Sequence, residues 1–108
     1  MGRLFYGTAE QPISIPDHLL SHLRAVITTK LRRSESFTVT WRHPEEDPDG
    51  RSTIWVHCSI PLRFVFDSAE PEKLDPEFLR ELARGANSSA GLTIDIEHEP
   101  ELAKLDAA

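Results

Sequence analysis

The stretch SFTVTWR, residues 36–42, decides the fold class because its hydrophobicity changes at every position. Its Phe, Val and Trp alternate with polar residues, which is the period of a strand that buries one face. A polar loop with two prolines and a glycine follows, and residues 52–58, STIWVHC, then resume the alternation. The two segments therefore predict an antiparallel hairpin.

Further short strands flank this hairpin on both sides. Residues 62–66, LRFVF, alternate again after a proline, and a turn at 59–61 would place them antiparallel to the second strand of the hairpin. The runs LFYG (4–7) and PISI (12–15) predict a first hairpin, and residues 92–97 predict a last strand. The sequence thus indicates six strands.

Two segments have the periodicity of helices. Residues 17–32 begin with an acid after a proline and end in basic residues, which matches the direction of a helix dipole. Asp75-Pro76-Glu77 supplies a capping side chain, a proline for the first turn and an acid, and so predicts the start of a second helix. The apolar stripe of the first helix comprises Leu19, Leu20, Leu23, Val26, Ile27 and Leu31.

The order strand, strand, helix, three strands, helix, strand predicts a single α+β domain over residues 1–97. Because both helices have one apolar face, we expect a mostly antiparallel, twisted sheet with both helices packed on the same side. A mixed sheet with a parallel pair around one helix is the alternative. Residues 98–108 are acidic, and we expect them to form a tail.

Composition excludes several classes of protein. The 108 residues carry a net charge of −6. Six basic and three acidic residues precede position 43, whereas six basic and fifteen acidic residues follow it. Such a balance argues against a dedicated nucleic-acid binder. No apolar run is long enough for a membrane span or a signal peptide, and the single cysteine, Cys58, fits a reducing compartment as a small core residue. We therefore expect a cytoplasmic protein without membrane contacts.

No motif predicts a catalytic residue, a cofactor or a metal. His18 and His22 have the i, i+4 spacing of zinc ligands but lack a third ligand, so we interpret them as solvated. The acidic loop at 45–50 lacks the ligand pattern of a calcium site and is interpreted as a solvated hairpin tip. The glycine-rich segment 85–91 follows a helix instead of opening one, which is unlike a phosphate loop.

Two surfaces are candidates for binding. Four basic residues near the end of the first helix are typical of a solvated dipole complement, or of a contact for phosphate or nucleic acid: Arg24, Lys30, Arg32 and Arg33. The sheet face opposite the helices is the stronger candidate, because an exposed Trp beside His, Arg and Thr is typical of an interface. Plain cross-strand packing and a small-ligand or catalytic role are the alternatives. Its members are Thr38, Thr40, Arg42, Thr53, Trp55, His57 and Arg63.

Three segments of the sequence resemble a family of roughly hundred-residue actinobacterial proteins of unknown function. They are KLRRSESFTVTW (30–41), GRSTIWVHCSIPLRFVF (50–66) and ANSSAGL (86–92). Many members are labelled as ATP-dependent DNA ligases. A ligase of that type takes AMP on a lysine within Lys-x-Asp-Gly, and neither Lys30, Lys73 nor Lys104 lies in that motif. The resemblance therefore implies no catalytic residue. We expect a non-enzymatic domain that binds a protein or a second copy as a homodimer, with a nucleic-acid accessory domain as the alternative.

Overall fold

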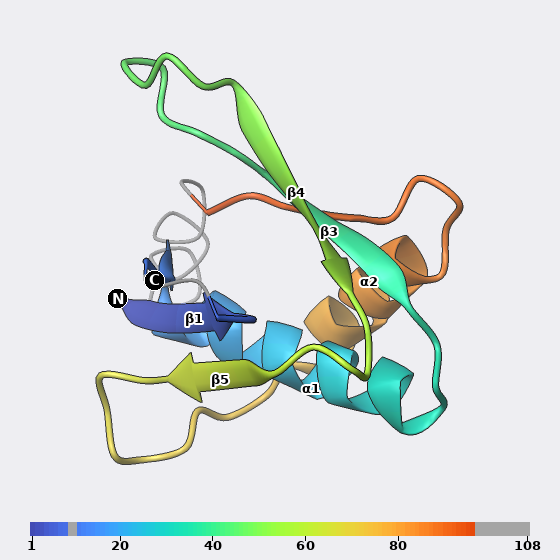
Figure 1. Ribbon diagram of the computed structural model, residues 1–108. Helices are drawn as coiled ribbons and strands as arrows, with labels where there is room; N and C mark the ends of the chain where they lie inside the picture. The colour runs from blue at the N-terminus through green and yellow to red at the C-terminus, as the bar shows by residue number, and fades with distance from the viewer. Residues whose placement is uncertain (9–10, 97–108) are drawn as a thin grey trace.

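The computed structural model describes residues 1–8 and 11–96 and confirms the α+β class (Figure 1). The expected acidic tail at 98–108 lies outside these residues. The order of the elements is the predicted one. They are β1 (Gly2–Tyr6), β2 (Ile13–Ile15), α1 (Asp17–Arg32), β3 (Phe37–Arg42), β4 (Arg51–Val56), β5 (Leu62–Val65), α2 (Pro76–Ala86) and β6 (Leu92–Ile94).

The six strands form two three-stranded sheets, ordered β2-β1-β5 and β4-β3-β6. The hairpins β1–β2 and β3–β4 are antiparallel as predicted, and the second runs in register from Phe37↔Val56 to Arg42↔Arg51. β6 lies parallel to β3 on its other side. The β4-β3-β6 sheet is therefore mixed, with one antiparallel and one parallel pair. A parallel pair is the feature of the mixed sheet that the sequence analysis gave as the alternative.

The predicted pairing of the 62–66 strand with its predecessor is wrong, because β5 pairs antiparallel with β1. Pro61 at the start of this strand has no N–H to donate to a neighbouring strand, and its carbonyl accepts the Gly7 N–H at 2.9 Å. On β4, the Trp55 carbonyl accepts the Tyr6 hydroxyl. β5 therefore extends the β2-β1 hairpin, and the strands divide into two sheets.

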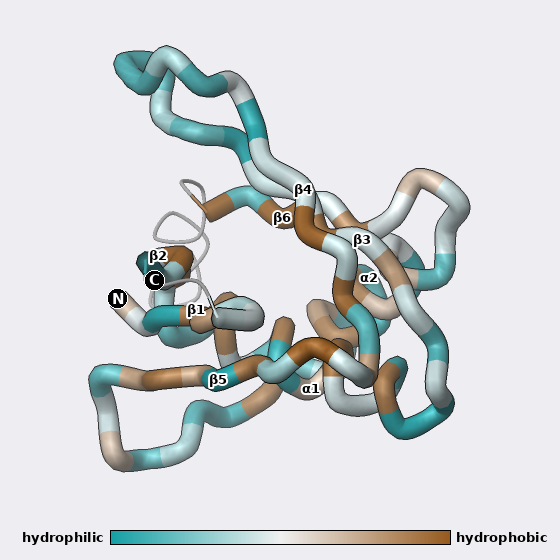
Figure 2. The backbone as a smooth tube through the Cα atoms, in the orientation of Figure 1, coloured by the Kyte–Doolittle hydropathy of each residue, from teal (hydrophilic) through white to brown (hydrophobic). Residues whose placement is uncertain are grey.

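The core fills the space between the two sheets and α1. Figure 2 shows apolar stretches on α1, β4, β5 and β6 around this space. On β3, β4 and β6 the inward residues are buried or half-buried and most of their sequence neighbours are more exposed, so the helices cover one side of this sheet only. The largest fully buried apolar side chains are Leu4, Ile15, Leu20, Leu23, Ile27, Val39 and Val56.

α1 and α2 pack side by side in the same direction. His22, in the first half of α1, contacts the start of α2, whereas Lys30, near the end of α1, bonds Asn87 at the C-cap of α2. Parallel helices bring both positive dipole ends together at one side and both negative ends at the other. Acids occupy the first turns and bases the last turns of both helices, which offsets this alignment.

His22 joins α1 to the N-terminus of α2. Its expected exposure is wrong, since the residue is 0% exposed. Nε2 accepts the Asp75 N–H at 2.8 Å, so that nitrogen carries no proton, and Nδ1 donates to the His18 carbonyl at 2.8 Å. The ring also lies 4.8 Å from that of Phe78. The neutral imidazole therefore satisfies its own polar atoms and one amide at the start of α2.

We predict that His22→Phe keeps the fold but destabilises it by about 1–3 kcal/mol, because the Asp75 N–H loses its buried acceptor. Urea denaturation measures the change in the free energy of unfolding. Hydrogen exchange supplies the local readout, with faster exchange of the Asp75 amide and little change at Leu79 N–H, which bonds the Asp75 carbonyl. Unchanged protection of the Asp75 amide would contradict the assigned hydrogen bond.

The chain approaches β3 closely at Gly91, the residue before β6. Gly91 has a φ of +82°, and a Cβ built on it would lie 1.9 Å from the Thr38 Oγ1. Any side chain here would be strained by the backbone and would also displace Thr38. Glycine at this position therefore allows β6 to pair with β3.

We predict that Gly91→Ala lowers the free energy of unfolding by about 2 kcal/mol or more, through left-handed backbone strain together with the clash against Thr38. Gly50→Ala is the matched control, because nothing lies within 4 Å of a Cβ at that position. Thermal unfolding of both variants measures the difference. Equal melting temperatures would show that β6 moves freely away from β3.

Candidate functional site

The outward side of the β4-β3-β6 sheet carries most of the predicted interaction surface. We define the outer face as Thr38, Thr40, Arg42, Arg51, Thr53, Trp55 and Thr93. Six of these residues form three directly opposed cross-strand pairs, Thr38↔Trp55, Thr40↔Thr53 and Arg42↔Arg51. The face thus runs from an aromatic end through hydroxyl groups to a cationic end.

Trp55 is the largest uncovered apolar side chain on the outer face. It is 53% exposed, and Met1 is the other exposed large hydrophobic residue in the described part of the chain. Its carbonyl is fixed by the Tyr6 hydroxyl, and its strand neighbour Val56 is fully buried. The indole therefore projects to solvent from a firmly held strand.

A row of threonines crosses the middle of the outer face. Thr40 and Thr53 are joined by a hydrogen bond of 2.7 Å between their hydroxyl oxygens, and Thr93 on β6 lies beside Thr40. A hydroxyl both donates and accepts, so this row can bond a wide range of polar groups. The sequence analysis missed Thr93, which becomes visible only when the parallel pairing of β6 is known.

Arg42 and Arg51 lie opposite each other where the hairpin extends away from the body of the protein (Figure 1). Like charges directly opposite on a sheet repel each other. Neither guanidinium has an ion-pair partner within residues 1–8 and 11–96. The sequence analysis missed Arg51, although a symmetrical closure of the loop 43–50 would have placed it opposite Arg42.

The remaining two predicted members do not belong to the β4-β3-β6 sheet. His57 follows β4, and its Nδ1 accepts the Ser59 N–H at 3.0 Å. Arg63 belongs to β5 in the other sheet, and its guanidinium lies 5.5 Å from the centre of the Phe5 ring. The structure therefore brings five of the seven predicted residues onto one surface and leaves these two outside it.

The four basic residues predicted as a contact near the end of α1 do not form one surface. Arg24, Arg32 and Arg33 are exposed, but Lys30 is buried. Its Nζ donates to the Asn87 Oδ1 at 2.8 Å and lies 3.4 Å from the Glu35 carboxylate. Lys30 therefore joins the C-terminal ends of the two parallel helices and is not presented to a ligand.

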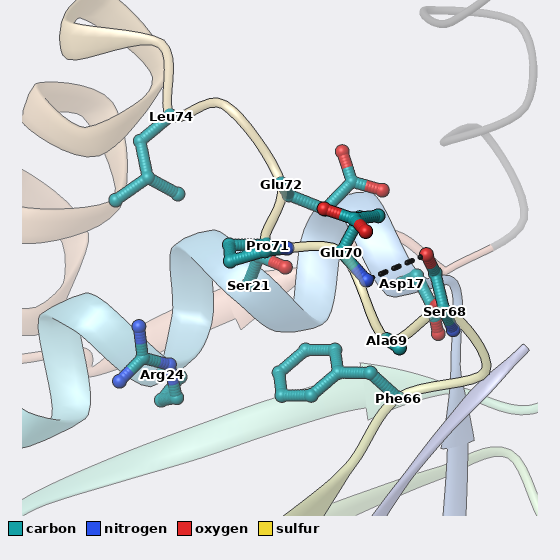
Figure 3. A pocket seen from close by; sticks show the side chains of 10 residues that line it. All are labelled: Asp17, Ser21, Arg24, Phe66, Ser68, Ala69, Glu70, Pro71, Glu72 and Leu74. Carbon is teal, nitrogen blue, oxygen red and sulfur yellow. Dashed lines mark hydrogen bonds between the residues drawn. The ribbon is translucent and has the colours of Figure 1, made fainter.

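A hollow of about 370 Å³ lies between α1 and the loop that follows β5 (Figure 3). Carboxylates of Asp17, Glu70 and Glu72 gather at one side, and Arg24 lies across the ring of Phe66 from them. Asp17 holds the loop, since its Oδ2 accepts the N–H of residue 67 at 3.0 Å. Its two hydroxyls belong to Ser21 and Ser68, and the Ser68 Oγ accepts the Glu70 N–H at 3.1 Å.

Other ionisable groups have structural surroundings. The hydrogen bond from the Met1 α-amino group lowers the pKa of the exposed Asp67 carboxyl, and the same bond raises the pKa of the amino group. In the described residues, no three His, Cys, Asp or Glu side chains are grouped as metal ligands would be.

Cys58 is exposed, which corrects its predicted place in the core. β4 ends at Val56, so the alternation that would bury Cys58 has already stopped.

Fold and surface together define a small α+β domain, in which residues 1–8 and 11–96 form two sheets and two parallel helices and leave the outer face of the β4-β3-β6 sheet open to solvent. The chain belongs to a family described as a domain of unknown function, DUF7882, whose model matches residues 1–97. No curated protein and no solved structure matches the chain.

We predict that Lys30→Met destabilises the domain by about 1–2 kcal/mol, because Asn87 and Glu35 lose a buried partner while the aliphatic stem is retained. Arg32→Met and Arg33→Met are the matched controls, since both side chains are exposed, and each is expected to change stability by less than about 0.5 kcal/mol. Urea denaturation measures all three. An equal effect at the three positions would argue that only the helix dipole matters.

Proposed function

We propose that this protein is a non-enzymatic interaction domain that binds a protein partner through the outer face. The half-exposed indole of Trp55 carries this proposal. Half of the indole surface is available to a partner without breaking any contact within the chain. Tryptophan and arginine are among the residues that most often dominate binding energy at interfaces.

The rest of the outer face supports the same function. Aromatic and arginine side chains are enriched at interfaces, whereas Lys, Asp and Glu are depleted, and the seven residues of the outer face include none of the latter three. The strands beneath are hydrogen-bonded on a buried core. Binding there would order few side chains and no backbone, which reduces its entropic cost.

The alternative, a nucleic-acid accessory domain that uses the basic end of α1, has weaker support. Of its four residues, Lys30 is buried in contact with Asn87 and Glu35, which leaves three arginines on a chain with a net charge of −6. Phosphate binding depends on several neighbouring cations. We therefore assign binding to the outer face.

We further propose a cytoplasmic location. The exposed thiol of Cys58 has no disulfide partner, and such thiols persist in reducing compartments. Neither α1 nor α2 combines the length and apolar character that crossing a membrane requires, so the described residues include no membrane-spanning helix.

We predict that a photoreactive amino acid at Thr53 cross-links the protein to a partner in the native cell. The same probe at Arg80, exposed on α2, is the matched control and should give little product. Adding Trp55→Ala to the Thr53 probe should remove most of the adduct, because the main apolar anchor is lost. The readout is the mass and abundance of the cross-linked bands. Equal adducts from both positions, or none from Thr53, would refute the proposed function.

A further inference from the structure

We infer that the partner of the outer face is a second copy of this chain, related by a two-fold axis that crosses the Thr40–Thr53 pair. This inference rests on the proposed function and specifies its partner. It follows from the order of side chains on the hairpin. This order complements that of a second copy whose strands run in the opposite direction.

The three cross-strand pairs are evenly spaced. Successive pairs lie two residues apart on each strand, so about 7 Å separates the threonine pair from the pair on either side. On β4 the order is Trp55, Thr53, Arg51. Because the hydroxyl stands at the centre, the aromatic ring and the guanidinium are equidistant from it.

A two-fold axis in the plane of the face and perpendicular to the strands exchanges the two ends. Trp55 then lies opposite the partner's Arg51, and the symmetrical contact forms a second time across the interface. A guanidinium over the face of an indole is a favourable cation–π pair. Thr53 meets the partner's Thr53, and two hydroxyls can bond because each is both donor and acceptor.

The same rotation also positions the two hairpin loops. It carries the acidic loop of one copy, with the exposed Glu45, Glu46 and Asp49, towards the end of the partner's β4, which His57 follows.

A two-fold axis along the strands would be a poor solution. It would place β4 of one copy over β3 of the other, so that Arg51 would face the partner's Arg42 and repel it. Trp55 would meet a threonine in that arrangement. The order of the ladder therefore favours one of the two face-to-face dimers.

Chemical cross-linking tests whether the outer faces of two copies meet. In a Cys58→Ser background, Thr53→Cys is treated with a bismaleimide about 10 Å long, which matches the usual spacing of facing sheets. Because a residue on the axis faces its own copy, we expect a product of twice 12.2 kDa. Arg80→Cys on α2 is the matched control and should give none.

Sedimentation equilibrium tests the Trp–Arg contact. We expect Trp55→Ala and Arg51→Ala each to weaken the dimer at least tenfold. The double variant should be no weaker than Trp55→Ala, because both substitutions remove the same contact. Arg80→Ala should leave the dimer unchanged. Circular dichroism checks folding, which these exposed positions should tolerate.

The outcomes separate this inference from the function beneath it. A monomer at every concentration, with photo-adducts from Thr53 that contain another protein, would overturn the two-fold dimer and leave the interaction domain standing. Additive effects of Trp55→Ala and Arg51→Ala would also overturn the assigned contact. Absence of any adduct from the outer face would defeat both proposals.

Discussion

The parallel alignment of α1 and α2 is the constraint on which the other features of the domain depend. Aligned dipoles repel at each end, and the chain meets this with acids at the first turns and bases at the last. Two hydrogen bonds from buried side chains of α1 hold the helices together: His22 accepts the Asp75 N–H, and Lys30 donates to Asn87. With both helices held on the inner side, nothing in the described chain covers the outer face of the β4-β3-β6 sheet.

The alignment itself follows from the topology. α1 leads into β3 and α2 leads into β6, and these two strands are parallel neighbours. When two helix-to-strand connections feed parallel strands from the same side, the helices must also run in one direction. Gly91 permits this, because its missing side chain lets the start of β6 lie against Thr38. A single close backbone contact is thereby linked to the packing of both helices.

Local periodicity was enough to predict α1 over 17–32, the capped start of α2 and the β3–β4 hairpin, because each is determined by neighbouring residues. The β1–β5 pairing is a long-range choice and left no local signal. His22 and Lys30 both continue the apolar stripe of α1: His22 lies three residues from Leu19 and four from Val26, and Lys30 lies three residues from Ile27 and four from Val26. Their helical position predicts burial, whereas their polarity alone predicts exposure.

Cross-strand pairing alone would explain the threonines of the outer face, but it does not explain its two ends. A sheet selected only for stability gains from opposite charges across strands, and carboxylates lie within the adjoining loop, yet Arg42 faces Arg51. Likewise, Trp55 contributes less to the core than an inward residue and leaves half its surface in water. The half-exposed indole of Trp55 is therefore the feature of the outer face that cross-strand pairing leaves unexplained and that the proposed partner would cover.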